Sequence, residues 1–258
     1  MSPTSSSERY LPGDAPVSRP AELSRNLAAM RTRIAAACAV AGRDPAELTL
    51  IAVTKTYPAS DVLGLASLGL TDFGENRDQE AVRKAAAVAA ARAPVTWHFI
   101  GQLQTNKADS VARYADFVHS VDRLRLVRAL GAAARAAARN LTCLVQVSLD
   151  PADSGADPAP AAGARGGVPP ARLAEVAAAI EAEQGLTLGG LMAVAPRNAD
   201  PRAAFAPLGQ LSDVVRSINA SATLVSAGMT GDLEAAIESG ATHLRIGTAL
   251  LGDRLPVL

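Results

Sequence analysis

The segment Leu48-Thr-Leu-Ile-Ala-Val-Thr-Lys55 decides how the rest of the chain is interpreted. Its mostly branched, apolar residues predict a strand that is buried on both faces. The strand ends on Lys55, and Pro58 stops it. Lysine occurs elsewhere only at positions 84 and 107. A desolvated lysine, unlike arginine, can lose its proton and attack a carbonyl, so Lys55 is placed to form a Schiff base. Alternatively, its side chain simply extends from the end of the strand into solvent.

Composition limits the classes of protein that the chain can belong to. Its 258 residues, 49% of them hydrophobic, suit one large α/β domain or two small ones. The 25 basic and 25 acidic side chains cancel, which predicts binding to neither nucleic acid nor an anionic membrane. Cys38 and Cys143 are too few for a disulfide framework. There is no apolar run of membrane-spanning length and no signal-peptide pattern, so we expect a cytoplasmic protein.

Strand-like and helix-like segments alternate along most of the chain. The helix at 20–41 is indicated by an apolar stripe at Leu23, Leu27, Met30, Ile34 and Cys38. The predicted strands cover 48–55, 71–75, 96–102, 117–121, 141–148, 186–194, 223–227 and 243–250. The predicted helices that separate them cover 59–68, 78–92, 107–115, 123–139, 170–184, 201–219 and 232–239.

Alternation of this kind builds a parallel sheet through right-handed crossovers. Eight units in roughly 250 residues match a (β/α)₈ TIM barrel in a single domain, 20–258, with an open doubly wound sheet as the alternative. No helix is expected after the last strand, and the helix at 20–41 would fill that gap in the outer ring. Residues 1–19, rich in Ser and Pro, are expected to form a disordered tail, and 150–167 a mobile loop.

Two glycine-containing turns follow the last two predicted strands. These are Ser226-Ala-Gly-Met-Thr-Gly-Asp232 and Arg245-Ile-Gly-Thr-Ala249. Barrels often bind phosphate after strands 7 and 8, where glycine lets the backbone approach an anion and a hydroxyl adds a donor. The pair therefore predicts a phosphate site, although either glycine alone indicates only a turn. Asp232 is also a candidate helix N-cap.

Several polar residues are expected inside the barrel or at its mouth. Alternation places Arg245 on the same strand face as His243, where it would form an ion pair with Glu75 or Asp122, or contact a ligand acceptor. His98, which shares a predicted strand face with Gln102, is more often a satisfied core histidine than a base. Trp97 and Phe99, on the opposite face, are expected to pack against helices.

These stretches resemble the pyridoxal-phosphate homeostasis proteins, the YggS/PROSC family, whose barrel is similar to the N-terminal domain of alanine racemase. The matching sequences are IAVTKTYP (51–58), FGENRDQE (73–80), WHFIGQLQTNK (97–107), HSVD (119–122), GLMAVAP (190–196) and SAGMTGDLEAAIESGATHLRIGTALLG (226–252). Two departures are Thr230, where the family usually has Ser, and Arg77, where it often has Tyr.

The resemblance implies a pyridoxal phosphate site with a role for each matching residue. Lys55 would form the aldimine, and Thr230, Gly247 and Thr248 would hold the phosphate, with Met229 in the same turn. Arg245 would face the pyridine nitrogen and Asn76 the ring hydroxyl. Because an arginine keeps that nitrogen unprotonated, the cofactor would be a weak electron sink.

Three functions remain open on this evidence. The first is a monomeric carrier that holds pyridoxal phosphate and delivers it to apo-enzymes without robust turnover. The second is a monomeric amino-acid racemase, which needs a base on each face of the cofactor. We expect no β-rich second domain of the kind that supplies a tyrosine base in alanine racemase. Tyr57 belongs to a turn, so His98 is the candidate second base. The third is a barrel enzyme that acts on a phosphorylated substrate without a cofactor.

Overall fold

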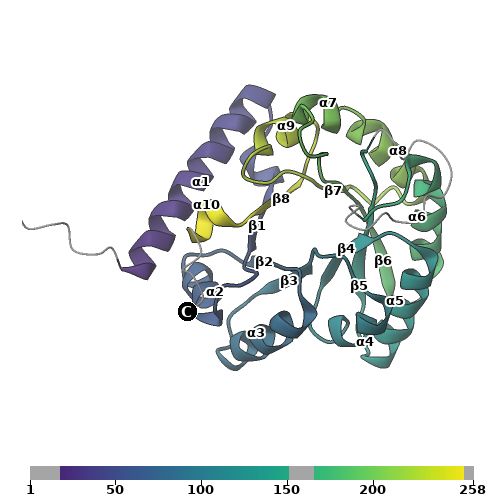
Figure 1. Cartoon of the computed structure of the whole chain (residues 1–258), viewed down its shortest axis with the longest axis horizontal. Coiled ribbons are helices and arrows are strands. Elements are labelled where there is room, and N and C mark those ends of the chain that lie inside the picture. Colours follow the sequence, from purple (N-terminus) through teal and green to yellow (C-terminus); the bar gives the residue numbers. More distant parts are fainter. Residues whose placement is uncertain (1–17, 151–165, 253–258) are drawn as a thin grey trace, which may run out of the picture.

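The computed structural model describes residues 18–150 and 166–252. Within them, eight parallel strands form a closed barrel in which each strand pairs with the next and the last pairs with the first (Figure 1). The strands are β1 (Thr49–Val53), β2 (Asp72–Glu75), β3 (Thr96–Phe99), β4 (Phe117–Val121), β5 (Leu141–Gln146), β6 (Leu186–Met192), β7 (Leu224–Ser226) and β8 (His243–Ile246). The predicted (β/α)₈ barrel is confirmed, and the open sheet is ruled out.

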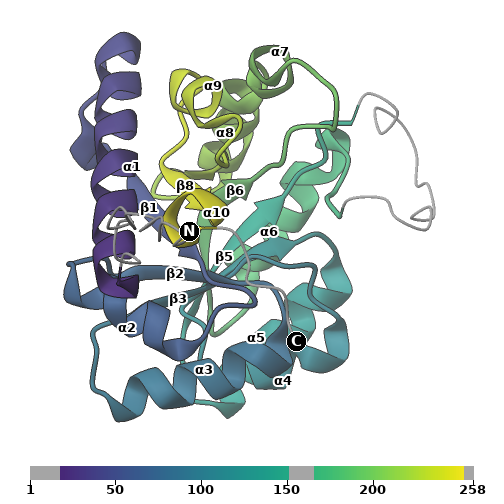
Figure 2. The ribbon, with the colours of Figure 1, turned by 60° about the vertical axis from the view of Figure 1, so that its left-hand side comes forward.

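Helices surround the barrel (Figures 1 and 2). They are α1 (Arg19–Ala41), α2 (Ala59–Ser67), α3 (Asp78–Ala90), α4 (Ala108–Val111), α5 (Leu124–Ala136), α6 (Leu173–Ala182), α7 (Pro201–Phe205), α8 (Leu208–Ile218), α9 (Leu233–Glu238) and α10 (Thr248–Leu251). Short 3₁₀ turns occur at Pro45–Glu47, Thr105–Lys107 and Pro170–Arg172. No helix in the described part of the chain is both long enough and apolar enough to cross a membrane.

Several predicted boundaries are wrong, and the helix predicted at 107–115 already ends at Val111. The last strand ends at Ile246 rather than at 250, because the chain turns at Gly247 (φ −107°, ψ −90°) into α10. A short helix therefore does follow the last strand. The single helix expected at 201–219 is divided into α7 and α8 at Pro207, which lacks the N–H that a continuous helix would need there. The third strand stops at Phe99 instead of 102.

The N-terminal helix closes the outer ring as predicted. Both views show α1, in purple, beside α10, in yellow (Figures 1 and 2), and α1 contacts α2, α9 and α10. Its apolar stripe is buried against them. Arg19 fixes the start of α1 by donating to both carboxylate oxygens of Asp61 on α2 and to the carbonyl of Leu251 on α10.

The inside of the barrel is more polar than its outer shell. Branched apolar side chains ordinarily fill the interior of such barrels. Here His98, His119, His243 and Arg245 are all at least nine-tenths buried, and the three histidine rings lie within 6.4 Å of one another, centroid to centroid. Trp97 and Phe99, on the opposite face of β3, are buried in the apolar shell as predicted. The structure therefore contains an unusual internal polar cluster.

Close contact between β6 and β7 depends on one glycine. Gly190 has φ of +151°, and a Cβ atom there would lie 1.9 Å from the carbonyl oxygen of Leu224. Only glycine accommodates both the conformation and the contact.

The predicted tail (1–19) and loop (150–167) lie almost wholly outside the described residues. Arg19 already belongs to α1. After the loop, Val168 forms an isolated parallel bridge with Val147, which ties the returning chain to the barrel.

Candidate functional site

The predicted site residues lie at one end of the barrel, on four consecutive strands. Lys55 follows β1 and Asn76 follows β2, while Met229 and Thr230 follow β7. Arg245 is on β8, and Gly247 and Thr248 come directly after it. Since β7, β8, β1 and β2 are neighbours in the closed sheet, the fold brings these positions together along one arc of the rim.

The turn that carries Lys55 is held by hydrogen bonds to the residues on either side of it. The hydroxyl of Thr54 donates to Glu75 at 2.6 Å, and the carbonyl of Thr54 accepts a hydrogen bond from Lys84 at 2.7 Å. Thr56, on the other side of Lys55, has φ of +70°, and its amide donates to the carboxylate of Glu80. Lys55 itself is half-buried, and its amine forms no hydrogen bond or ion pair with the other described residues. Its neighbours are therefore held while its amine is free.

The anchor is a buried ionic cluster. Lys84 on α3 forms an ion pair with Glu75 and another, at 3.1 Å, with Glu80. Burial raises the pKa of Glu75, and the hydrogen bonds from Lys84 and Thr54 oppose that shift. Two buried acceptors at the end of β2, Glu75 Oε2 and Asn76 Oδ1, have no hydrogen-bond partner among the described residues. Orphaned buried acceptors of this kind suit a ligand that donates hydrogen bonds.

Contacts near β2 and β8 bring neighbouring backbones close together. A Cβ atom on Gly101 would lie 2.4 Å from the carbonyl oxygen of Asn76, so only a glycine lets the chain after β3 approach that residue. A Cβ atom on Gly247 would lie 3.5 Å from the carbonyl oxygen of Val53, which places the end of β8 beside the end of β1.

The residues of the two turns expected to bind phosphate lie at or near the surface. Thr230 is half-buried, whereas Met229 and Thr248 are exposed. Asp232 occupies the N-cap position of α9, as predicted, but its side chain forms no capping hydrogen bond to that helix. Its carboxylate instead accepts from the amide of Met229, which fixes the turn.

Arg245 is a buried cation without a carboxylate partner in the described part of the chain. Its guanidinium donates to the hydroxyl of Ser226 at 2.7 Å and to the carbonyl of Ala193 at 2.9 Å, both neutral acceptors. The predicted alternative of an ion pair is wrong, because Glu75 binds Lys84 and Asp122 binds Arg123. Burial lowers the pKa of Arg245 to about 10, so it stays protonated at neutral pH. Guanidinium carries five N–H donors, which leaves several for a ligand.

His98 is a satisfied interior histidine. Its Nε2 is 2.9 Å from Asp72 Oδ1 and its Nδ1 is 2.9 Å from His119 Nε2. Gln102 does not share its strand face, because β3 has already ended, and it is exposed. Tyr57 donates its hydroxyl to the carbonyl of Gly252 at 2.6 Å. Both ring nitrogens of His98 are thus occupied, and neither it nor Tyr57 is available as a base.

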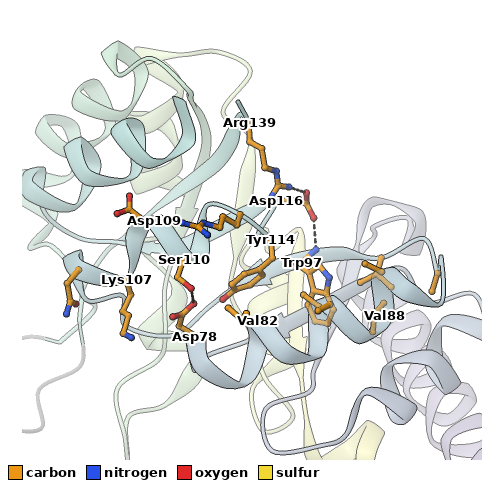
Figure 3. Close-up of a pocket in the computed structure, with 17 residues that line it drawn as sticks. Asp78, Val82, Val88, Trp97, Lys107, Asp109, Ser110, Tyr114, Asp116 and Arg139 are labelled. Atoms are coloured by element: carbon orange, nitrogen blue, oxygen red, sulfur yellow. Dashed lines mark hydrogen bonds and ion pairs between the residues drawn. The ribbon is translucent and has the colours of Figure 1, made fainter. Parts of the chain in front are cut away.

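A groove of about 770 Å³ lies elsewhere, on the outside of the barrel between α3 and α4. Figure 3 shows Ser110 and Asp78 pointing toward one another at one end, and Asp116 between Arg139 and Trp97 at the other. None of the predicted site residues lines this groove. A smaller hollow of about 410 Å³ lies on the rim and includes Met229, Gly231 and Asp232. Of the predicted site residues, only Met229 lines this hollow.

The sequence did not reveal the structural roles of four residues that shape the site: Glu80, Lys84, His119 and Ser226. The Glu80 and Lys84 pair has the i, i+4 spacing of a helical ion pair, so it was open to detection. His119 and Ser226 lie 107 positions apart, and no local pattern relates them.

An amine at the end of the first strand and a buried arginine on the last define a barrel protein of the alanine racemase N-terminal type. Residues 25–255 match the family model described as alanine racemase, N-terminal domain. The chain is 42% identical over 253 residues to the pyridoxal phosphate homeostasis protein of Mycobacterium tuberculosis, with 92% of this chain and 94% of that protein covered. It is 35% identical over 237 residues to the protein of the same name in Escherichia coli, covering 90% and 97%. The chain belongs to the pyridoxal phosphate homeostasis (YggS/PROSC) family.

Solved structures agree with this assignment. PipY of Synechococcus elongatus, solved with pyridoxal phosphate bound, is 30% identical with a TM-score of 0.75, and 89% of this chain and 100% of that one are covered. Alanine racemase of Corynebacterium glutamicum, at 14% identity and a TM-score of 0.62, shares the fold over 90% of this chain and 62% of its own.

Proposed function

We propose that this protein binds pyridoxal 5′-phosphate reversibly at the rim of the barrel and takes part in its homeostasis and delivery inside the cell. The observation that carries the proposal is the Lys55 amine, half-buried and unpaired within the described chain, on a turn whose neighbouring residues are fixed by Glu75, Glu80 and Lys84. The homeostasis name of its relatives and the cofactor bound in PipY support the same conclusion.

The residues on the rim fit this cofactor. When bound, pyridoxal phosphate supplies an aldehyde that a primary amine can attack, together with a ring that withdraws electrons. Lys55 provides that amine, and the hydroxyls of Thr230 and Thr248 and the backbone at Met229 and Gly247 suit the phosphate. The orphaned Oδ1 of Asn76 can accept from a ring hydroxyl.

Arg245 disfavours amino-acid chemistry, but the second base is what separates a carrier from a racemase. Burial lowers its pKa to about 10, so Arg245 stays protonated at neutral pH and would present an N–H donor to the pyridine nitrogen, leaving that nitrogen without a proton. This weakens the electron sink on which amino-acid chemistry depends. Racemisation also requires a base on each face, and His98 is occupied by Asp72 and His119. The carrier function is favoured over the racemase chiefly because both ring nitrogens of His98 are occupied.

The test is a titration of the apo-protein with pyridoxal phosphate, followed by absorbance, and then transfer from the loaded protein to an apo-enzyme that requires this cofactor. We expect saturation at one cofactor per chain, a monomer in sedimentation experiments, and activation of the apo-enzyme. Lys55→Ala is the matched control, because it removes the amine without touching the anchoring cluster. No absorbance change with the wild-type protein, or an equal change with Lys55→Ala, would contradict the proposal.

A further inference from the structure

A continuous line of hydrogen bonds crosses the inside of the barrel. It begins at Asp72 on β2, passes through His98 on β3 and His119 on β4, crosses to Ser226 on β7 and ends at Arg245 on β8. The heavy-atom distances are 2.9, 2.9, 2.8 and 2.7 Å in that order. The side chain of Asp72 is 21% exposed, whereas the middle members are almost fully buried. The line thus joins a carboxylate that touches solvent to the buried cation of the site.

The two ends of this line have fixed roles. A guanidinium can only donate, so the oxygen of Ser226 must accept from Arg245. Burial raises the pKa of Asp72, but hydrogen bonds from His98 and Thr71 outweigh that effect and lower it overall. Asp72 is therefore ionised at neutral pH and can only accept, and Nε2 of His98 must carry a proton.

The proton positions on the two middle histidines depend on these fixed ends. Burial lowers the pKa of His119 well below its ordinary value, so its ring is neutral. A His98 ring with a single proton, on Nε2, accepts at Nδ1 from a protonated Nε2 of His119. The Nδ1 of His119 then accepts the hydroxyl proton of Ser226. Every bond points the same way, from Arg245 toward Asp72, and every ring nitrogen in the line is satisfied.

We propose that Asp72, His98, His119 and Ser226 form a one-directional relay that positions Arg245 for its ligand. Because the hydroxyl proton of Ser226 is committed to His119, the lone pairs of its oxygen are left for the guanidinium. The carbonyl of Ala193 holds a second guanidinium nitrogen. The side chain is thereby fixed, and its remaining N–H groups are kept for the ligand. These four are positioning residues, and their effect on pyridoxal phosphate rests on the function proposed above.

His243 supplies a matched control. It is also an interior histidine, 7% exposed, with its ring 6.4 Å from that of His119. Its Nδ1 lies 2.8 Å from the hydroxyl of Thr242. No hydrogen bond among the described residues joins it to the relay.

The first test uses the apo-protein and is independent of any cofactor. Long-range ¹H–¹⁵N NMR of histidine-labelled protein at pH 7, assigned with single His→Gln variants, reports which ring nitrogen carries the proton. We expect both His98 and His119 to be neutral and protonated at Nε2. A proton on Nδ1 of either ring, or a charged His98, would overturn the relay.

The second test measures how the relay acts on the site. Ser226→Ala removes the link directly, and His119→Gln removes it while keeping a group near the position of Nε2. We expect each to raise the dissociation constant for pyridoxal phosphate about 3- to 10-fold, the effect of one lost hydrogen bond. We also expect each to shift the absorption maximum of the bound cofactor, which general destabilisation would not do. His243→Gln should change neither the dissociation constant nor the absorption maximum.

Equal effects in all three variants, or none in Ser226→Ala, would overturn the positioning role. A wild-type protein that binds no pyridoxal phosphate would overturn the proposed function and with it the effect on Arg245. The NMR result would still decide, separately, whether the relay exists.

Discussion

The ammonium group of Lys84 donates a hydrogen bond of 2.7 Å to the carbonyl oxygen of Thr54, the residue directly before Lys55. Lys84 also forms ion pairs with Glu75 and Glu80, and the carboxylate of Glu80 accepts from the amide of Thr56, directly after Lys55. The backbone on both sides of Lys55 is therefore fixed by one buried cluster. The amine that we assign to the cofactor owes its position to this second lysine.

Breaking the cluster should destabilise the fold. Lys84→Met leaves the carboxylate of Glu75 buried without a cation, and we expect the free energy of unfolding to fall by about 3–5 kcal/mol in urea titrations at pH 7. The double variant Glu75→Gln/Lys84→Met removes both charges and should recover most of that loss. Arg216→Ala, which breaks the exposed pair with Asp213, should stay within about 0.5 kcal/mol of wild type. If Lys84→Met is as stable as the wild-type protein, the cluster does not contribute to the stability of the fold.

The hydroxyls on the rim should act through the phosphate. We expect Thr230→Ala and Thr248→Ala each to weaken binding of pyridoxal phosphate by about 1–3 kcal/mol, the range for a hydrogen bond to a charged group. Thr→Ser at each position keeps the hydroxyl and should retain affinity. Calorimetric titration with pyridoxal, which lacks the phosphate, supplies the control: its affinity should not change. Equal losses for both ligands would remove the hydroxyls from the phosphate site.

Buried neutral histidines should make the protein sensitive to mild acid. Burial lowers the pKa of His243 from 6.5 to about 4, so the unfolded chain takes up a proton near pH 6.5 that the native state refuses until about pH 4. Stability is therefore lost as pH falls through this window. Relative to His243→Gln, the wild-type protein should lose about 2 kcal/mol between pH 7 and pH 5 in urea titrations. Comparing the two slopes cancels other groups, including Glu75, whose raised pKa acts in the opposite direction. Identical slopes would contradict a neutral His243.

Amino acids should not be turned over. With His98 occupied by Asp72 and His119, residues 18–150 and 166–252 offer no candidate second base, and such a group typically contributes ~10²–10⁴-fold. We expect no multiple-turnover racemisation of L-amino acids by loaded wild-type protein, measured by chiral chromatography after long incubation in D₂O. Proton exchange without inversion would agree with a one-sided site. Inversion over many turnovers, lost in His98→Ala, would establish the racemase alternative.

The sequence predicted the barrel because each strand has a local hydrophobic pattern in consecutive residues. Branched apolar residues before Lys55 indicated β1, and strand alternation placed His243 and Arg245 on the same interior face, as found. The end of β8 was predicted wrongly because Ala249, Leu250 and Leu251 are apolar residues that would suit a strand. In the structure they belong to α10.

The interior relay could not be predicted in the same way. His119 and Ser226 come from opposite parts of the closed sheet, and their contact depends on the geometry of the whole barrel. Lys84 was noticed only as a scarce residue. Its bond to Thr54 depends on how α3 packs over β1 and β2, which periodicity does not determine.

The measurement that tests the account most directly is borohydride reduction of the loaded protein followed by peptide mass mapping. Lys84 is 5% exposed and occupied by Glu75 and Thr54, and Lys107 lines the groove between α3 and α4. We predict a single pyridoxyl group, on Lys55. A pyridoxyl group on Lys84 or Lys107 in place of Lys55 would contradict the account.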